Sequence, residues 1–264
     1  MCRRRAGTRA IATYSILKPF ETLPPIARMP ATTPATKPSL PFDAVIFDCD
    51  GVLVDSERIT NRVLSQMLGE LGWAISVEET MRVFIGKAVR DEAARIEANT
   101  GVAITDEWLT QFRERRNAAL ERELVGIDGA LAAVRALYEA LDGRIAVASG
   151  ADRHKVEMQL KKTGLLEYFE GRIFSGHEMP RSKPHPDVYL AAAEALGVDP
   201  TRCAVVEDTV TGATAGVAAG ATVFGYAPAS LSHSTPDGLR EVGAARVFED
   251  MAQLPALLAQ WRRA

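Results

Sequence analysis

The stretch AVIFDCDGVLVDSE, residues 44–57, decides the fold. Its apolar beginning has the length of a strand and runs directly into Asp48, Cys49, Asp50 and Gly51. An apolar run that ends in such a turn signal is typical of a buried parallel strand. Because residues two apart in an extended chain face the same side, Asp48 and Asp50 are expected to converge, and Gly51 lets the backbone turn away.

Two convergent carboxylates repel each other unless a cation or a shared proton offsets their charge. A hard cation such as Mg²⁺ suits oxygen ligands and often needs only one or two carboxylates. A single Asp at this place would more simply cap a helix or form a turn. The pair followed by glycine instead favours a functional site at the end of this strand.

Composition excludes several classes of function. The chain has 264 residues, 47% of them hydrophobic and 25% charged, with a formal net charge of -3. This balance gives no general attraction to nucleic acid or anionic membrane, and no apolar run has the length of a membrane span. The cysteines Cys2, Cys49 and Cys203 show neither a disulfide framework nor zinc-site spacing. We therefore expect a cytoplasmic monomer without nucleic-acid or membrane partners.

Residues 1–41 differ in composition from the rest of the chain. They contain Arg3-Arg4-Arg5, seven prolines and one acidic residue, Glu21, without a periodic apolar face. Such a segment cannot bury a core, so we expect a disordered tail. The alternative is a mis-assigned start, with Met29 as the true first residue. The arginine-rich beginning is superficially similar to an organelle transit peptide, but its prolines interrupt any amphipathic helix.

The remaining chain alternates between two patterns. Residues 59–124 are almost wholly helical in pattern, beginning with an apolar spacing of four. Their charged run Arg113-Glu114-Arg115-Arg116 is interpreted as a solvated helix face. Strands are expected near 144–150, 172–175, 203–206, 221–225 and 246–248, with helices between them. Strand–helix alternation predicts an α/β fold, a Rossmann-like parallel sheet covered on both faces. The expected domains are a core of residues 42–58 and 125–264 and an inserted all-helical cap of residues 59–124.

Polar residues follow several of the predicted strands. They are Asp48 and Asp50, then Ser149 and Gly150, then Glu207 and Asp208, with Lys183 in the connection after the third strand. Ligands of open parallel sheets bind outside the carboxyl ends of the strands, so these groups are expected to meet. Singly, each also fits an ordinary turn, a helix cap or a surface lysine. Together they provide the parts of a phosphoryl-transfer site.

These residues also resemble, in order, the four motifs of the haloacid dehalogenase-like hydrolase superfamily in its phosphatase form. The motifs are Asp48-x-Asp50-Gly51, Val147–Gly150, Ser182–Asp187 and Val205–Thr209 with Gly212. The resemblance extends over about residues 42–260 and is closest to the phosphosugar phosphatases and β-phosphoglucomutases with an inserted helical cap. The chain departs from the usual pattern at Val210-Thr211 and at Gly150, and neither departure removes a catalytic group.

The resemblance implies a role for each motif residue. Asp48 is the expected nucleophile, which forms an aspartyl phosphate, and Asp50 the general acid and base. Ser149 and Gly150 are expected to donate to phosphate oxygens, while Lys183 stabilises their charge. The Mg²⁺ site is expected at the carboxylates of Asp48 and Asp208 and the backbone carbonyl of Asp50. Glu207 is expected to lie close to the metal or to bind it.

Substrate choice is expected to lie with the cap. Lys87 and Arg90 stand beside Gly86 at a break in the helical pattern, which is similar to the subgroup's substrate-reading segment. Both are candidates to bind substrate, and solvated surface charges are the alternative.

The preferred function is Mg²⁺-dependent hydrolysis of a small phosphorylated metabolite, a sugar or sugar-acid phosphate. The first alternative is a phosphosugar mutase of the β-phosphoglucomutase type. A 2-haloacid dehalogenase would not need the second Asp or the acidic pair. A non-enzymatic phospho-receiver would be about half as long, with its acidic pair before the accepting Asp.

Overall fold

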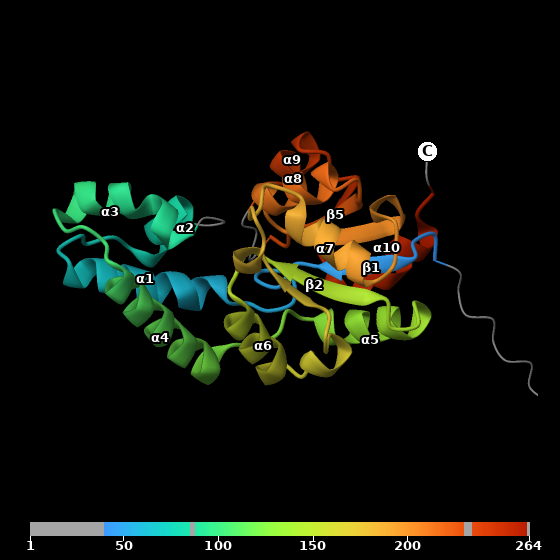
Figure 1. Ribbon diagram of the computed structural model, residues 1–264, viewed down its shortest axis with the longest axis horizontal. Helices are drawn as coiled ribbons and strands as arrows, with labels where there is room; N and C mark the ends of the chain where they lie inside the picture. Colours follow the sequence, from blue (N-terminus) through green and yellow to red (C-terminus); the bar gives the residue numbers. More distant parts are fainter. Residues whose placement is uncertain (1–39, 85–87, 230–233, 263–264) are drawn as a thin grey trace, which may run out of the picture. The chain divides into compact units, whose positions relative to one another are not determined.

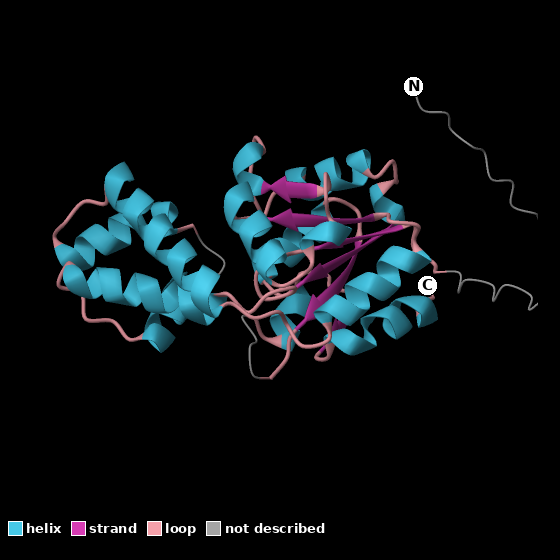
Figure 2. Cartoon of the chain, turned by 90° about the horizontal axis from the view of Figure 1, so that it is seen from below, coloured by secondary structure: helices cyan, strands magenta, loops and turns pink. Residues whose placement is uncertain are grey.

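Six strands form one parallel sheet in the computed structural model, which describes residues 40–84, 88–229 and 234–262 (Figures 1 and 2). The described residues belong to one unit, Lys37–Ala264. The strand order is β3-β2-β1-β4-β5-β6. The strands are β1 Ala44–Phe47, β2 Ile145–Ser149, β3 Ile173–Ser175, β4 Cys203–Glu207, β5 Thr222–Tyr226 and β6 Arg246–Phe248.

Helices cover both faces of the sheet because the strands are apolar on both sides. Val45 and Phe47 point into one buried cluster, whereas Ala44 and Ile46 point into another, as the two-residue period of a strand requires. The first cluster also includes residues of α5 Ala130–Ala140, α6 Arg153–Lys162 and α10 Leu254–Gln260. The second includes residues of α7 Asp187–Ala195, α8 Val210–Ala218 and α9 Pro236–Glu241. The α/β class predicted from the sequence is confirmed.

A helical segment separates β1 from the rest of the sheet in the sequence. It contains α1 Glu57–Glu70, α2 Val77–Phe84, α3 Ala93–Thr100 and α4 Asp106–Glu123, with a 3-10 turn at Val89–Glu92. These helices share a buried cluster of their own, which includes Leu64, Met67 and Phe112, and α1 packs against α2 and α4 (Figure 1). We propose that they form the cap, with boundaries near residues 58 and 125. No helix in the described ranges is long and apolar enough to cross a membrane.

The chain reverses its direction of travel across the sheet at β1. From β1 it proceeds to β2 and β3 on one side, then returns to β4, β5 and β6 on the other. Phe47 lies opposite Val147 of β2 and Val206 of β4, so all three strands end at the same edge. Such a switch point is where open α/β sheets bind ligands.

Candidate active site

Asp48 is the first residue after β1 and is buried, with 7% of its surface exposed. Its backbone N–H donates to the carbonyl of Val206 at 2.9 Å, which holds it against β4. Its Oδ1 accepts a hydrogen bond from Lys183 Nζ at 2.6 Å. Burial, with the charges of Glu207 and Asp50, raises the pKa of Asp48 to about 7, although Lys183 opposes the shift. Any further positive charge beside Asp48 would therefore stabilise its ionised carboxylate.

Lys183 joins two of the predicted motifs directly. Its buried ammonium donates to Asp48 Oδ1 and to Glu207 Oε1, each at 2.6 Å, and lies 4.8 Å from the ring centre of Tyr189. Burial alone would lower the pKa of Lys183, but the charges of Asp48 and Glu207 raise it well above its ordinary value. The residue is thus a fixed positive charge at the switch point.

Glu207 uses its whole carboxylate within the protein. Its Oε1 accepts hydrogen bonds from Lys183 and from the Tyr189 hydroxyl, at 2.6 and 2.9 Å. Its Oε2 accepts from the backbone N–H groups of Asp208 and Thr209 and from Thr209 Oγ1, all at 3.0 Å. The sequence interpretation had Glu207 either beside the metal or bound to it. Because both oxygens of Glu207 already accept hydrogen bonds from the protein, the contacts favour the first alternative, in which Glu207 lies beside the metal and holds Lys183.

Asp208 completes the acidic pair and is buried. Burial raises its pKa well above the ordinary value, and the charges of Glu207, Asp48 and Glu57 add to the shift. Two buried carboxylates at one strand edge form an oxygen-donor set that fits a hard cation such as Mg²⁺. Among the described residues no group of three or more His, Cys, Asp or Glu side chains is arranged for a metal. A cation here would therefore rely on Asp48, Asp208 and the Asp50 carbonyl.

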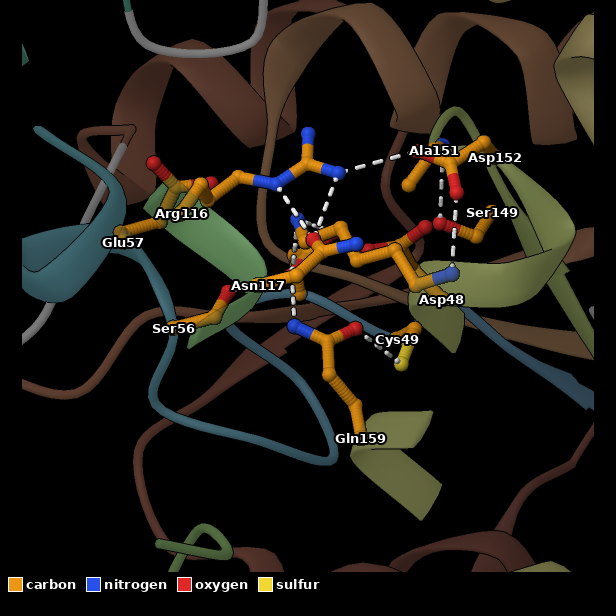
Figure 3. Close-up of polar contacts among 12 residues, drawn as sticks. Asp48, Cys49, Ser56, Glu57, Arg116, Asn117, Ser149, Ala151, Asp152 and Gln159 are labelled. Carbon is orange, nitrogen blue, oxygen red and sulfur yellow. Dashed lines mark hydrogen bonds and ion pairs between the residues drawn. The ribbon is translucent and has the colours of Figure 1, made fainter. Parts of the chain in front are cut away.

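Ser149 ends β2 and is buried, whereas Gly150 is exposed. The Ser149 hydroxyl accepts a hydrogen bond from the backbone N–H of Ala151 at 3.1 Å (Figure 3). A Cβ placed on Gly150 would meet nothing within 4 Å. Steric crowding therefore does not explain why the chain has glycine here, where the family usually has a larger residue. Phosphate binding by Ser149 and Gly150 stays a prediction.

Asp50 has partners that sequence reasoning missed. Lys155 and Gln159 of α6 and the Ser56 hydroxyl all donate to its carboxylate. Burial would raise the pKa of Asp50, but the charge of Lys155 and the hydrogen bonds from all three residues lower it to about 2. A sequence signal was available, since Lys155 and Gln159 are four apart, each just before an apolar residue, Val156 and Leu160. That spacing places both on one helix face beside the core.

Arg116 corrects the interpretation of residues 113–116 as a solvated helix face. Arg116 is buried, and its Nη2 donates to Asp152 Oδ2 at 3.0 Å, which joins α4 to the beginning of α6 (Figure 3). The same guanidinium donates to Asn117 Oδ1 at 2.9 and 3.1 Å. By contrast Arg115 is exposed and paired with Glu70, as the interpretation expected. The charged run therefore includes one buried contact between the proposed cap and the core.

The two candidate substrate residues of the cap have different outcomes. Lys87 lies outside the described residues. Arg90 is exposed and pairs with Asp106 at 2.5 Å. A role of Arg90 in substrate binding stays a prediction.

Comparison with known proteins supplies the family. The model of the haloacid dehalogenase-like hydrolase family matches residues 42–220. The 6-phosphogluconate phosphatase of Escherichia coli K12 is 32% identical over 217 residues, which are 82% of this chain and 94% of that protein. Hexitol phosphatase B of the same organism is 33% identical over 180 residues, 67% of this chain and 79% of that protein.

A solved structure agrees with these matches. A haloacid dehalogenase family hydrolase from Deinococcus radiodurans R1, with bound phosphate and sodium, is 37% identical with a TM-score of 0.69. The match covers 84% of this chain and 97% of that structure. The resemblance inferred from the four motifs is confirmed. The chain belongs to the haloacid dehalogenase-like hydrolase family.

Proposed function

We propose that this hydrolase is a Mg²⁺-dependent phosphatase that cleaves a sugar or sugar-acid phosphate through an aspartyl phosphate on Asp48. The observation that carries the proposal is the Lys183 ammonium between Asp48 and Glu207, at the strand edge that also bears Asp50 and Asp208. A fixed cation beside a buried carboxylate suits attack on a phosphate ester. The substrate class is supported by relatives named for 6-phosphogluconate, hexitol and phosphoglycolate phosphatase activity.

The chemistry divides into two steps that share one acid–base residue. In the first, a carboxylate oxygen of Asp48 bonds to phosphorus, the ester P–O bond breaks, and Asp50 gives its proton to the departing oxygen. In the second, water attacks the phosphorus of the aspartyl phosphate and Asp50 takes a proton from that water. The Asp48–phosphorus bond then breaks, which restores both carboxyl groups and releases inorganic phosphate.

The surrounding residues prepare these steps. Lys183 holds Asp48 in place and offers positive charge to the phosphate oxygens, and Ser149 and Gly150 are the further proposed donors to those oxygens. When bound by Asp48, Asp208 and the Asp50 carbonyl, Mg²⁺ supplies the charge that offsets repulsion between carboxylate and phosphate. The acid role needs a proton on Asp50, and a phosphate dianion brought beside that carboxyl favours it, because a nearby negative charge raises a carboxyl pKa.

The test is phosphate release from a panel that includes 6-phosphogluconate, hexitol phosphates, phosphoglycolate and 4-nitrophenyl phosphate, with the product identified. Release of inorganic phosphate together with the free sugar or sugar acid supports the proposal. Conversion to an isomeric sugar phosphate would instead identify a mutase. Absence of turnover on every ester with Mg²⁺ present would contradict both.

Removal of divalent cations gives a separate prediction. Treatment with EDTA is expected to lower the rate of phosphate release by about 100-fold or more, because several kcal/mol of charge stabilisation is lost. Added Mg²⁺ should restore the rate, whereas Na⁺ at equal ionic strength should not. Circular dichroism would verify that the chelated protein stays folded. Unchanged turnover after chelation would exclude the proposed cation.

Arg90→Ala tests the proposed cap specificity. A contact that closes over the substrate is worth about 1.5–3 kcal/mol when desolvated, so kcat/KM for the best sugar phosphate is expected to fall roughly ten- to hundredfold. Turnover of 4-nitrophenyl phosphate should change little, since that ester needs only the core motifs. Arg95→Ala is the matched control, because Arg95 also pairs with a carboxylate of the helical segment, Glu92. Equal losses on both esters would assign Arg90 to general stability.

A further inference from the structure

The carboxylate of Asp50 is held mainly by helix α6. Lys155 Nζ donates to both oxygens, Oδ1 and Oδ2, at 2.8 Å each, and Gln159 Nε2 donates to Oδ1 at 2.9 Å. Lys155 is buried, with 5% of its surface exposed. Its sequence separation from Asp50 is 105 residues, so the contact depends on how α6 packs against the sheet. We name Lys155 and Gln159 the α6 clamp.

The clamp is itself held at both of its residues. The Cys49 thiol donates to Gln159 Oε1 at 3.6 Å (Figure 3). Since Gln159 Nε2 donates to Asp50, the Gln159 amide is fixed between Cys49 and Asp50. Burial and the charges of Asp50 and Asp48 raise the pKa of Cys49 well above its ordinary value, which keeps the thiol protonated as a donor. The backbone N–H of Lys155 donates to Asp152 Oδ1 at 2.9 Å, which caps α6.

The same capping residue receives a contact from the helical segment. Asp152 Oδ2 accepts the hydrogen bond from Arg116 of α4, while its Oδ1 accepts the one from Lys155 N–H. The first turn of α6 is thus fixed to α4 on one side and to Asp50 on the other. Helix α6, which holds the Asp50 carboxylate together with the nearby Ser56 hydroxyl, is therefore itself fixed to α4.

A buried lysine beside a buried aspartate could serve charge balance alone. In that case its loss would lower stability and affect every substrate equally. The geometry favours a role in catalysis in addition to charge balance. The Lys155 contact involves both carboxylate oxygens, the Gln159 amide supports it, and Asp50 lies two residues from the proposed nucleophile. Displacement of a reacting group by about 1 Å can cost roughly 100-fold in rate.

We propose that Lys155 is a positioning residue for phosphoryl transfer, which holds the Asp50 carboxyl where it exchanges a proton with the departing ester oxygen. The inference rests on the proposed function and deepens it. Lys155 contacts neither substrate nor phosphorus in this role and acts only through Asp50. Gln159 supports the same position from the next turn of the helix.

The leaving group provides the test. A sugar alkoxide needs a proton as it departs, whereas 4-nitrophenolate departs readily without one. The value of kcat/KM reports the steps up to departure of the leaving group, so it isolates the acid role of Asp50. The experiment compares kcat/KM for the best sugar phosphate of the panel with that for 4-nitrophenyl phosphate, at saturating Mg²⁺.

Lys155→Met is expected to lower kcat/KM for the sugar phosphate by about 100-fold and that for 4-nitrophenyl phosphate by less than about tenfold. Lys155→Arg keeps a charged donor and is expected to recover most of the sugar phosphate activity. Lys161→Met is the matched control, since it removes the same charge from an exposed position of the same helix and should leave the ratio unchanged. The ratio of the two kcat/KM values does not depend on the fraction of folded enzyme.

Equal losses on both esters in Lys155→Met would overturn the inference while the proposed function stands. If the wild-type enzyme turned over neither ester, the proposed function would be wrong, and the inference would fall with it. Should Lys155→Met not fold, Gln159→Met takes its place, because it removes one hydrogen bond to Asp50 and keeps the ammonium. Its ratio is expected to shift in the same direction by a smaller factor, and an unchanged ratio would count against the clamp.

Discussion

Asp48→Asn is expected to lower phosphate release by at least about 1,000-fold, because it replaces the carboxylate proposed to attack phosphorus with a neutral amide, which is a much weaker nucleophile. The replacement has nearly the same volume, and Lys183 keeps its second partner, Glu207. Since the charge of Asp48 is unfavourable in its buried site, a neutral side chain should not lower the melting temperature. Phosphate release and thermal unfolding, measured on the same preparation, test both statements.

Two controls sharpen this prediction. Asp237→Asn makes the same chemical change at an exposed residue of α9 and should leave turnover unchanged. Asp50→Asn should also fail in turnover but allow slow phosphorylation, so the mass of one phosphoryl group should appear on the peptide that contains Asp48. Near wild-type turnover in Asp48→Asn would exclude the covalent mechanism.

The fold could be predicted because its signals are local. Ala44–Phe47 is apolar at every position, which marks a strand covered on both faces, and the structure confirms this by placing alternate residues in two clusters. The residues at the carboxyl end of each such strand, the last in the strand or the first after it, then lie at the ligand-binding edge of a parallel sheet. Asp48, Ser149 and Glu207 could therefore be named from the sequence alone.

The α6 clamp could not be named in this way, because it depends on packing rather than on a strand end. Lys155 reaches Asp50 only once α6 lies against the sheet, and a lysine on a charged helix is ordinarily solvated. The role of Glu207 also could not be predicted from the sequence. Its neighbour Asp208 has a similar side chain, and only the contacts distinguish Glu207, which holds Lys183, from Asp208, which we propose binds the cation.

Arg116 was misread for a geometric reason. At about 3.6 residues per turn, four successive charged residues extend around most of a helix, so one of them must face inward. Arg116 lies four residues after Phe112 and four before Leu120, both buried, and thus belongs to the apolar stripe of α4. Helical periodicity gives better guidance here than charge density.

Gly212→Ala is expected to disable the site by displacing Glu207. A Cβ on Gly212 would lie 1.6 Å from Glu207 Oε1 and 2.0 Å from its Cδ, inside the first turn of α8. The carboxylate cannot yield easily, since Lys183, Tyr189 and Thr209 all donate to it. Breaking such a buried network costs about 3 kcal/mol or more, and Lys183 would lose one of its two carboxylate partners.

The melting temperature of Gly212→Ala should therefore fall by roughly 10 °C, and phosphate release should be lost with it. Gly69→Ala is the matched control, because a Cβ there meets nothing within 4 Å and Gly69 lies inside α1. That variant should gain up to about 1 kcal/mol in stability, as alanine is the better helix former.

A second substitution separates the cause of the instability from its effect on catalysis. Glu207→Asp shortens the side chain and makes room for the new methyl group, so the double variant Gly212→Ala/Glu207→Asp should be more stable than Gly212→Ala alone. Phosphate release should stay low, because the shorter carboxylate no longer reaches Lys183 as Glu207 does at 2.6 Å. A double-mutant cycle on unfolding free energies measures this coupling, and additive effects would show that the clash with Glu207 is not what destabilises Gly212→Ala.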